Sequence, residues 1–278
     1  MILHSDWHIH SEASYDASLP LQQILRDAQQ LGFEKVGITD HLNFNDHAFV
    51  ADIRRSARDV AALQPQFPQL VLGVELTPIE KPLFDYIAKT GSRDGYEPPA
   101  TDKPYDIELP MTLSQLKALG IRYAVGASHW RVDLPHARKM PLERDTIIRE
   151  WYRQQMWLAC DERVTILGHP WYIGEGLWYD DFSVIPASMN RDIAAAVKEH
   201  GKYVECSEGM LCDPLTSERF RHQYAEFLRE LFEMGIPVTY GSDSHSVFAP
   251  DAEKAAAYLE AAGFRDGDIG EVKESDLW

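Results

Sequence analysis

The sequence predicts an α/β fold in which a mostly parallel sheet closes into a TIM-like barrel. Seven short apolar runs recur along the chain, segments with helical character separate them, and no shift in composition interrupts the alternation. Seven strand–helix units in 278 residues fit a barrel with one unit missing or distorted. A doubly wound open sheet is the alternative, although the sequence has neither a glycine fingerprint for a dinucleotide nor a P-loop.

The predicted strands are apolar runs, and most of them end in a polar residue. They cover residues 2–8, 35–41, 70–76, 121–129, 164–169, 202–206 and 237–243. Helices are predicted over residues 19–31, 48–63, 112–119, 143–160, 189–200, 217–234 and 251–262. The first helix has the usual boundary signals, because Pro20 lies in its first turn and Gly32 follows its last residue.

One region, residues 77–110, breaks the alternation. It is rich in proline and in charged residues, and it is longer than most connections within a compact domain. We interpret it as an insertion into the barrel, with a short strand predicted at residues 84–88.

Composition limits the classes of partner. The chain is 45% hydrophobic and 26% charged, which suits a globular protein with a sizeable core. Its formal net charge of −17 argues against nucleic acid binding through a general basic surface. No run approaches the ~20 apolar residues of a membrane span, and no apolar leader precedes Asp6. Because Cys160, Cys206 and Cys212 form no CxxC pair, we expect a reducing, cytoplasmic location. The sequence does not predict the oligomeric state.

Histidines and carboxylates gather where the predicted strands end. His8 and His10 are two residues apart, so both imidazoles point to the same face of an extended strand. The carboxyl ends of parallel strands meet on the functional face of a barrel, and imidazole and carboxylate groups are ligands of divalent transition metals. The sequence therefore predicts a metal site at this face. The polar residues at these strand ends are His8, His10, Asp40, His41, Glu75, His129, His169, Cys206, Asp243 and His245, and Asp16 lies close after the first pair.

Single members of this set have ordinary alternatives. Cys206, at the end of the sixth predicted strand, is explained equally well as a small buried core residue. Considered without the other residues, Glu75 would be interpreted as a paired or exposed carboxylate, and His169 as a hydrogen-bonded loop residue. The convergence of the whole set on one face is what favours a shared site.

In this order, the motifs resemble those of the PHP family, the polymerase-and-histidinol-phosphatase superfamily of metal-dependent phosphoesterases. The matching segments are HIH at 8–10, TDH at 39–41, GVEL with Glu75, ASHW with His129, GHP with His169 and DSH at 243–245. The resemblance spans nearly the whole chain. It implies a single PHP domain over residues 1–278, folded as a distorted (β/α)7 TIM-like barrel with the metal site at the carboxyl ends of the strands.

The resemblance also implies two to three divalent ions of zinc, manganese or iron. By position, the first ion would bind His8, His10, Glu75 and Asp243, the second Glu75, His129 and His169, and the third Asp16, His41 and His245. Many relatives have histidine where this chain has Asp16. Because carboxylate oxygen is harder than imidazole nitrogen, we expect the third site to favour manganese or iron over zinc, or to bind more weakly.

The expected chemistry is hydrolysis by a hydroxide that bridges two metals, which lower the pKa of the bound water and neutralise phosphoryl oxygens. Glu75 and Asp243 have the catalytic role of holding these metals. Asp40 and Asp6 are assigned the role of orienting a ligand imidazole. For Asp6, a solvated turn residue is an equally good interpretation.

The substrate is expected to be a small phosphate monoester, with histidinol phosphate among the candidates. Histidinol phosphatases of the family carry an acidic and then a basic residue after the GH of the fifth strand, whereas PWYIGEGLWYDD here contains neither Arg nor Lys. Arg131 is the nearest candidate for a phosphate clamp, with a surface arginine as the alternative. Four tryptophans lie next to the proposed ligands in the sequence: Trp7, Trp130, Trp171 and Trp178. Trp130 and Trp171 are the candidates for binding the substrate, and core packing at the barrel mouth is the alternative for all four. Amide or phosphodiester hydrolysis and a catalytically silent metal-stabilised module remain the alternative functions.

Overall fold

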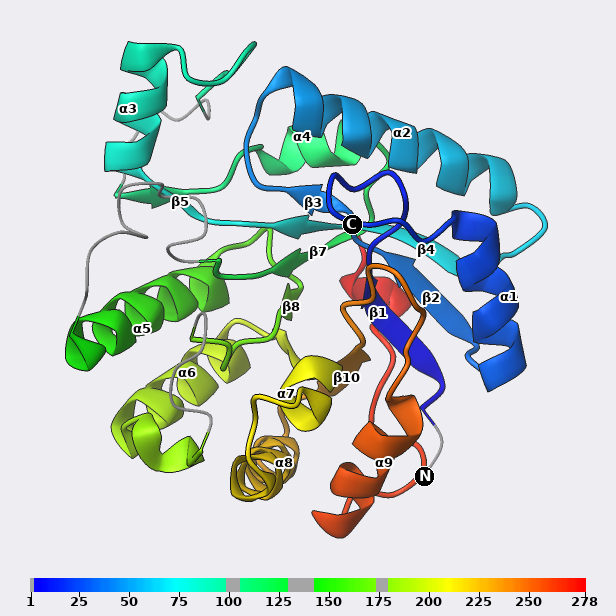
Figure 1. Ribbon diagram of the computed structural model, residues 1–278, viewed down its shortest axis with the longest axis vertical. Helices are drawn as coiled ribbons and strands as arrows, with labels where there is room; N and C mark the ends of the chain where they lie inside the picture. Colours follow the sequence, from blue (N-terminus) through cyan, green and yellow to red (C-terminus); the bar gives the residue numbers. More distant parts are fainter. Residues whose placement is uncertain (1–2, 99–105, 130–142, 174–179) are drawn as a thin grey trace.

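The computed structural model describes residues 3–98, 106–129, 143–173 and 180–278. Within them, the main sheet is a path of seven parallel strands (Figure 1). Their order is β1 (Ser5–Ile9), β2 (Lys35–Ile38), β4 (Leu70–Leu76), β7 (Tyr123–Gly126), β8 (Ile166–Leu167), β9 (Tyr203–Ser207) and β10 (Val238–Gly241). A two-residue strand, β3 (His41–Leu42), pairs with β4 beyond the end of β2.

The first and last strands close this sheet into a barrel. The Asp243 amide donates to the His8 carbonyl oxygen at 2.8 Å, and the His10 amide donates to the Ser244 carbonyl oxygen at 2.9 Å. These hydrogen bonds join the segment after β10 to β1. The predicted TIM-like barrel is therefore confirmed, and the doubly wound open sheet is excluded.

Helices surround the barrel, close to where the sequence predicts them (Figure 1). They are α1 (Leu21–Leu31), α2 (His47–Leu63), α4 (Leu113–Ala118), α5 (Arg144–Cys160), α6 (Ala187–Glu199), α8 (Glu218–Glu233) and α9 (Ala252–Ala261). Gly32 ends α1 with a φ of 81°, a left-handed conformation in which glycine carries no Cβ penalty. A further short helix, α7 (Glu208–Cys212), follows β9 directly and was not predicted.

The insertion has its own secondary structure. Strand β5 (Ile79–Glu80) pairs in antiparallel fashion with β6 (Ile107–Glu108), and helix α3 (Lys81–Thr90) lies between them in sequence. The prediction of a strand at residues 84–88 is wrong. Leu83, Phe84 and Ile87 are buried, and their spacing places them on one face of a helix, which Pro82 in the first turn also favours.

No described helix combines the length and the apolar character that crossing a bilayer requires.

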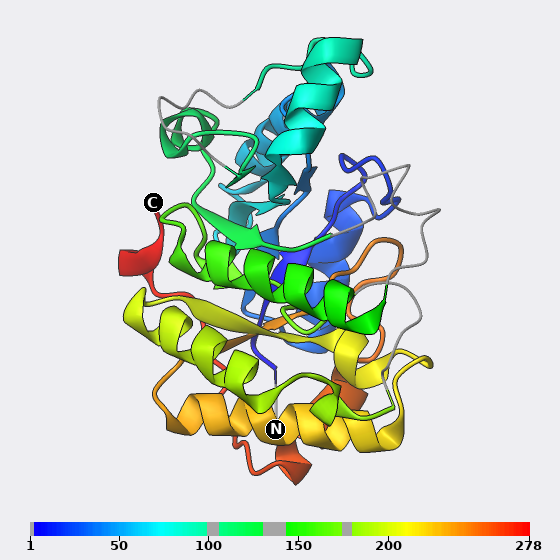
Figure 2. The same cartoon turned by 90° about the vertical axis from the view of Figure 1, so that its left-hand side faces the viewer.

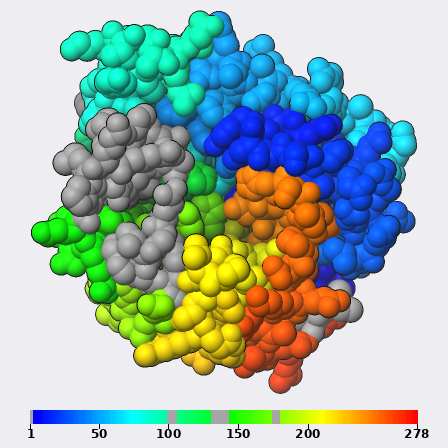
Figure 3. Space-filling model, viewed as in Figure 1, coloured from blue at the N-terminus to red at the C-terminus, as the bar shows by residue number. Residues whose placement is uncertain are grey.

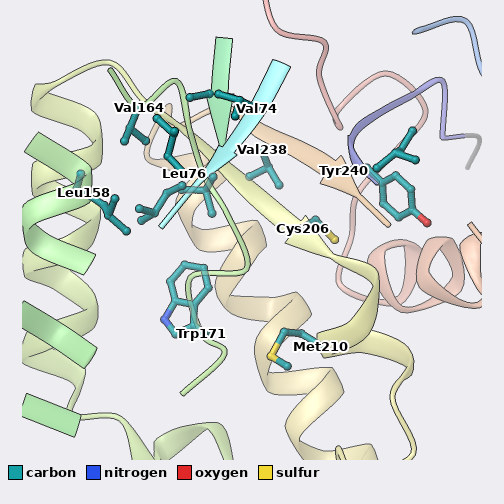
Figure 4. Packing of buried hydrophobic residues seen from close by; sticks show 14 of the residues in the cluster. Val74, Leu76, Leu158, Val164, Trp171, Cys206, Met210, Val238 and Tyr240 are labelled. Carbon is teal, nitrogen blue, oxygen red and sulfur yellow. The ribbon is translucent and has the colours of Figure 1, made fainter. Parts of the chain in front are cut away.

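Two apolar layers hold the barrel together. The larger layer fills the space between the sheet and the helices, and Figure 4 shows Trp171, Cys206 and Met210 within it. The smaller layer lies inside the barrel and contains Trp7, Val71, Tyr123, Val125, Ile166, Tyr203 and Val272. Val272 belongs to the C-terminal segment, which lies at the opposite end of the barrel from the loops that follow β1 and β10 (Figure 2).

The side chains of β9 show how one strand serves both layers. Cys206 and Val204 face the outer core, whereas Tyr203 packs inside the barrel. Glu205 lies between these two outward residues and therefore points inward, toward the carboxyl ends of the strands. Strand alternation thus assigns Cys206 to the core and gives its neighbour, Glu205, access to the barrel interior.

Candidate metal centre

A cavity of about 340 Å³ opens at the carboxyl ends of the strands. The segments that line it follow β1, β9 and β10, and they meet on one face of the molecule, in blue, yellow and orange (Figure 3). Its described lining includes six of the predicted ligands, namely Asp16, His41, His129, His169, Asp243 and His245. His8, His10 and Glu75 lie beneath this cavity and are fully buried.

The first predicted ligand group has the spacing of a tetrahedral site. The Nε2 atoms of His8 and His10 are 3.2 Å apart, and each lies 3.5 Å from an oxygen of Glu75. Asp243 Oδ1 is 3.4 Å from His8 Nε2 and 3.0 Å from His10 Nε2. Ligands of tetrahedral zinc stand roughly 3.3 Å apart, as follows from metal–ligand distances near 2.0–2.1 Å. The residues therefore fit a divalent ion.

Glu75 links this group to two others. Its Oε1 lies 3.1 Å from His169 Nε2 and 3.4 Å from His129 Nε2. Its Oε2 lies 2.5 Å from His41 Nδ1 but makes no hydrogen bond, although it is completely buried. An unpartnered buried carboxylate oxygen is costly, and a cation would offset that cost. Glu75 thus occupies the position of a ligand shared between sites.

Asp16 joins the third predicted group. Its Oδ2 lies 3.2 Å from His41 Nε2 and 3.6 Å from His245 Nε2. His10, His41 and His245 also form a group whose ligand atoms all lie within 4.8 Å of one another. The structure therefore brings together all nine predicted ligands, and it leaves His10 close to both the first and the third group.

Burial and mutual charge set the protonation of these groups. Burial lowers the pKa of His10 to about 3 and that of His129 to about 4, so both rings are neutral at pH 7 and have a lone pair for a metal. Burial alone would raise the pKa of Glu75, but His41, His129 and His8 hold it well below its usual range. Burial would likewise lower the pKa of His41, but Glu75 and Asp16 raise it to about 10. In the metal-free protein the His41 ring is therefore charged at pH 7, and its positive charge offsets that of Glu75.

Two groups that were not predicted from the sequence bond to rings of the predicted ligands. Glu205 Oε2 accepts from His8 Nδ1 at 2.6 Å, and Thr77 Oγ1, which donates to Asn43 at 2.7 Å, accepts from His129 Nδ1 at 2.8 Å. These contacts place hydrogen on Nδ1 and leave Nε2 of both rings free to bind a metal. The available signal for Glu205 was a carboxylate inside an otherwise apolar predicted strand.

The predicted orienting residues have a different role. Asp40 accepts from the Ser11 amide at 2.6 Å and from the Ser11 hydroxyl at 2.9 Å. Asp6 accepts from the amides of His8 and Ser242, each at 3.1 Å. Both carboxylates thus hold loop and strand backbone in place, and neither bonds to an imidazole of the described residues. Asp6 is also completely buried, so the alternative of a solvated turn residue is wrong.

Two of the predicted ligands have unusual backbone conformations. His169 has a φ of 25° and Asp243 a φ of 54°, both in the left-handed region that non-glycine residues rarely adopt. Such strain persists where surrounding contacts determine the conformation, and it concentrates at functional sites. The His169 amide is held by Glu205 Oε1 at 3.0 Å, and the Asp243 amide is held by the closing bond to β1.

The predicted substrate residues are placed differently from the ligands. Trp171 is in the core, where it packs on Phe182 and Phe227 and donates its indole hydrogen to Asn190 at 3.1 Å, so it does not line the described wall of the cavity. Trp7 packs inside the barrel. Trp130, Arg131 and Trp178 lie outside the described residues. The described wall next to the ligands consists of Tyr15, Asn43, Tyr172, Ser207, Gly209, Met210 and Asp213.

Comparison with known proteins gives one family and one fold. Residues 6–209 match the PHP domain family. A solved structure of histidinol phosphate phosphatase from Lactococcus lactis subsp. lactis Il1403, complexed with zinc, L-histidinol and phosphate, superposes with a TM-score of 0.66. It is 17% identical, and 95% of each chain is covered, so the likeness shows a shared fold.

Other solved structures are more distant. An apo protein from Agrobacterium tumefaciens has a TM-score of 0.48 at 11% identity, covering 96% of this chain and 91% of that one. A Xaa-Pro dipeptidase with bound methionine has a TM-score of 0.43 at 12% identity, covering 95% and 71%. No curated protein sequence matches this chain.

Proposed function

The chain belongs to the PHP domain family and is a metal-dependent hydrolase, and from this premise we propose that it hydrolyses a small phosphate monoester with two to three bound divalent ions. We also propose that residues 1–278 form one PHP domain with an insertion at about 77–110. The preference for manganese or iron at the third site and the cytoplasmic location remain predictions.

One observation carries the proposal: a completely buried Glu75 surrounded by ring nitrogens, with a first ligand group at tetrahedral spacing. His8, His10, Glu75 and Asp243 would hold one ion. Glu75, His129 and His169 would hold a second, and Asp16, His41 and His245 a third. Bound ions at these positions would lower the pKa of a coordinated water and neutralise phosphoryl oxygens.

The remaining residues act on the ligands and on the substrate. Glu205 and Thr77 bind the Nδ1 side of His8 and His129, so Nε2 of each ring would face the metal. The cavity leaves room for a small leaving group beside Tyr172 and Met210. A phosphate would enter from the side of Asp16 and His245, which are about one-third exposed.

The described wall also bears on the leaving group. Apart from the proposed ligands, the described wall of the cavity contains one charged residue, the negatively charged Asp213, and neither arginine nor lysine. A leaving group with an amino group would be attracted by this carboxylate, whereas one with a second anionic group would be repelled. Histidinol phosphate, which carries an amino group, therefore remains one candidate, and Arg131 remains the proposed phosphate clamp.

The decisive experiment is an assay of protein reconstituted with Zn²⁺ or Mn²⁺ against phosphate monoesters, phosphodiesters and amides. We expect hydrolysis of monoesters and two to three equivalents of metal by elemental analysis. Hydrolysis confined to diesters or amides would replace the proposed reaction. A fully metal-loaded protein inactive on all three classes would favour the silent binding module, and less than one equivalent of metal would overturn the metal centre itself.

Asp213→Asn tests the leaving-group preference. The asparagine oxygen can still accept from the Leu215 amide, as Asp213 Oδ1 does at 2.7 Å, so the loop should keep its conformation. Because the pair would be exposed to solvent, we expect only about a fivefold loss in kcat/KM for an amine-bearing monoester. A neutral monoester of similar size is the internal control and should be unaffected. Equal losses for both substrates would contradict the assignment.

A further inference from the structure

Strand β1 contains a bulge immediately before the first metal ligand. Asp6 lies opposite Val36 of β2, and Ile9 lies opposite Ile38, so three steps along β1 correspond to two along β2. The extra residue breaks the alternation of side chains. As a result, two consecutive residues face the barrel interior: Trp7 packs in the inner layer, and His8 contacts Glu75 and Glu205.

Side chains bond to the backbone of this bulge. The Asp6 carboxylate accepts from the His8 amide at 3.1 Å, and the Thr39 hydroxyl accepts from the Ile9 amide at 3.0 Å. The Trp7 carbonyl oxygen accepts from the Tyr123 hydroxyl at 2.8 Å. Tyr123 is the distant member of this group, since it belongs to β7, on the other side of β2 and β4.

Two glycines give Tyr123 its path to β1. Gly73 of β4 is in register with Tyr123, and a Cβ there would stand 2.5 Å from the tyrosine ring. A Cβ on Gly37 of β2 would overlap the tyrosine hydroxyl and would stand 3.1 Å from the Trp7 Cα. The ring thus crosses the barrel over two positions without side chains. It meets Trp7 edge to face, with ring centroids 5.4 Å apart.

We propose that Tyr123 is a positioning residue for the metal centre: its hydroxyl, bonded to the Trp7 carbonyl, holds the β1 bulge that turns His8 into the barrel beside His10. This inference rests on the metal centre proposed above. Tyr123 is not part of the described cavity wall, and its hydrogen bond goes to the backbone of β1 and not to the side chain of a proposed ligand. The contribution of its ring, which fills the barrel interior, is separate from that of its hydroxyl.

The direct test compares two tyrosine-to-phenylalanine variants of the inner layer. Tyr123→Phe keeps the ring and removes the bond to the bulge. Tyr203→Phe is the matched control, because the described partners of the Tyr203 hydroxyl, Asp276 at 2.6 Å and the Lys273 amide at 3.1 Å, both lie in the C-terminal segment and not in β1. Both variants lose one buried hydroxyl, so any general effect on folding should be shared.

The first readout is Zn²⁺ binding by the chelator-stripped protein, titrated against a chromophoric competitor. We expect Tyr123→Phe to bind its tightest ion about tenfold more weakly than wild type, as is typical when a group that orients a ligand is lost. Tyr203→Phe should match wild type. A wild-type protein that binds no Zn²⁺ would overturn the metal centre, whereas equal affinity in wild type and Tyr123→Phe would overturn only the role of Tyr123.

The second readout needs no metal. Hydrogen exchange of the His10 and Asp243 amides reports the seam next to the bulge, because both amides donate across it. We expect faster exchange at these two amides in Tyr123→Phe and unchanged exchange in Tyr203→Phe. Unchanged exchange in both variants would contradict the proposal, as would equal acceleration in both.

A third variant covers the case in which Tyr123→Phe fails to fold. Gly37→Ala leaves Tyr123 intact but places a methyl group where its hydroxyl oxygen lies. We expect the same weakening of Zn²⁺ binding and the same faster exchange. A Gly37→Ala protein with wild-type values for both would show that the bulge does not depend on this hydroxyl.

Discussion

At the scale of single residues, the candidate centre depends on how one buried carboxylate is compensated. Glu75 is completely buried and lies within 3.5 Å of ring nitrogens from His8, His10, His41, His129 and His169. In the metal-free protein, the compensation comes from imidazoles that hold protons, above all His41. Bound dications would replace those protons, so metal binding and proton release are linked at this site.

Glu75→Gln should abolish most of the activity. The amide keeps the shape of the side chain but removes the negative charge that two metal sites share. We expect a loss in kcat of more than ~10²-fold together with a lower metal content, measured by steady-state kinetics and elemental analysis. A variant with full metal content and wild-type kcat would contradict the bridging role.

Glu205→Gln should weaken metal binding without removing a ligand. The new amide can donate to His8 Nδ1, which favours the tautomer with hydrogen on Nε2, the atom that faces Glu75 and Asp243. We expect Zn²⁺ affinity to fall about 10- to 100-fold, measured with a competing chelator. Glu208→Gln is the matched control, because Glu208 is a buried carboxylate that accepts from Tyr240 and bonds to no imidazole. Similar affinity losses in both variants would argue against the tautomer explanation.

At the scale of elements, helix α7 begins with a buried carboxylate whose charge is unfavourable. Burial raises the pKa of Glu208 from its ordinary value of 4.5 to about 7. The unfolded chain therefore loses this proton near pH 4.5 and the folded protein near pH 7. Between these values the folded state holds the extra proton, so this group makes the free energy of unfolding fall as pH rises.

Glu208→Gln should consequently stabilise the protein more at pH 8 than at pH 5. The amide can still accept from the Tyr240 hydroxyl, and it carries no charge to bury. Full removal of the shift corresponds to a gain of about 3 kcal/mol at pH 8. Urea denaturation of both proteins at the two pH values is the measurement. A stability difference independent of pH would show that Glu208 does not titrate in this range.

The elements also show where prediction from the sequence succeeds and where it fails. Apolar runs and their polar ends are local features, so the seven barrel strands, most helices and the gathering of His and carboxylate residues at one end of the barrel could be predicted. Helix α3 was mistaken for a strand because a short apolar run fits both periods. The bulge in β1 depends on the register of β1 against β2. Whether Cys206 or Glu205 points into the barrel likewise depends on how β9 pairs with its neighbours, and the periodicity of one strand does not give this information.

At the scale of the whole molecule, the barrel has a functional end and a closed end. The C-terminal segment covers the closed end: Val272 packs on the inner layer, the Lys273 amide donates to the Tyr203 hydroxyl at 3.1 Å, and the Trp278 amide donates to the Arg122 carbonyl oxygen at 2.6 Å. The C-terminal segment lies at the opposite end of the barrel from the loops that follow β1 and β10 (Figure 2). Stability and chemistry should therefore be separable.

Deletion of residues 270–278 tests that separation. It exposes the lower surface of the inner layer and removes the buried Val272 side chain, which alone contributes about 1.5–3 kcal/mol. We expect a lower urea midpoint, with kcat and metal content close to wild type at temperatures where the protein stays folded. Loss of metal from the folded truncated protein would show that the two ends are coupled.

The seam that closes the barrel also constrains when the centre can form. The Ser242 amide donates to Asp6 across 236 positions of sequence, and the bonds that position His8, His10 and Asp243 lie beside it. Contacts at such separation are late events in folding, because most of the chain must be ordered before they can form. During synthesis, β1 emerges from the ribosome long before β10 does. The first ion can therefore be captured with its full ligand set only after β10 and Asp243 have been made.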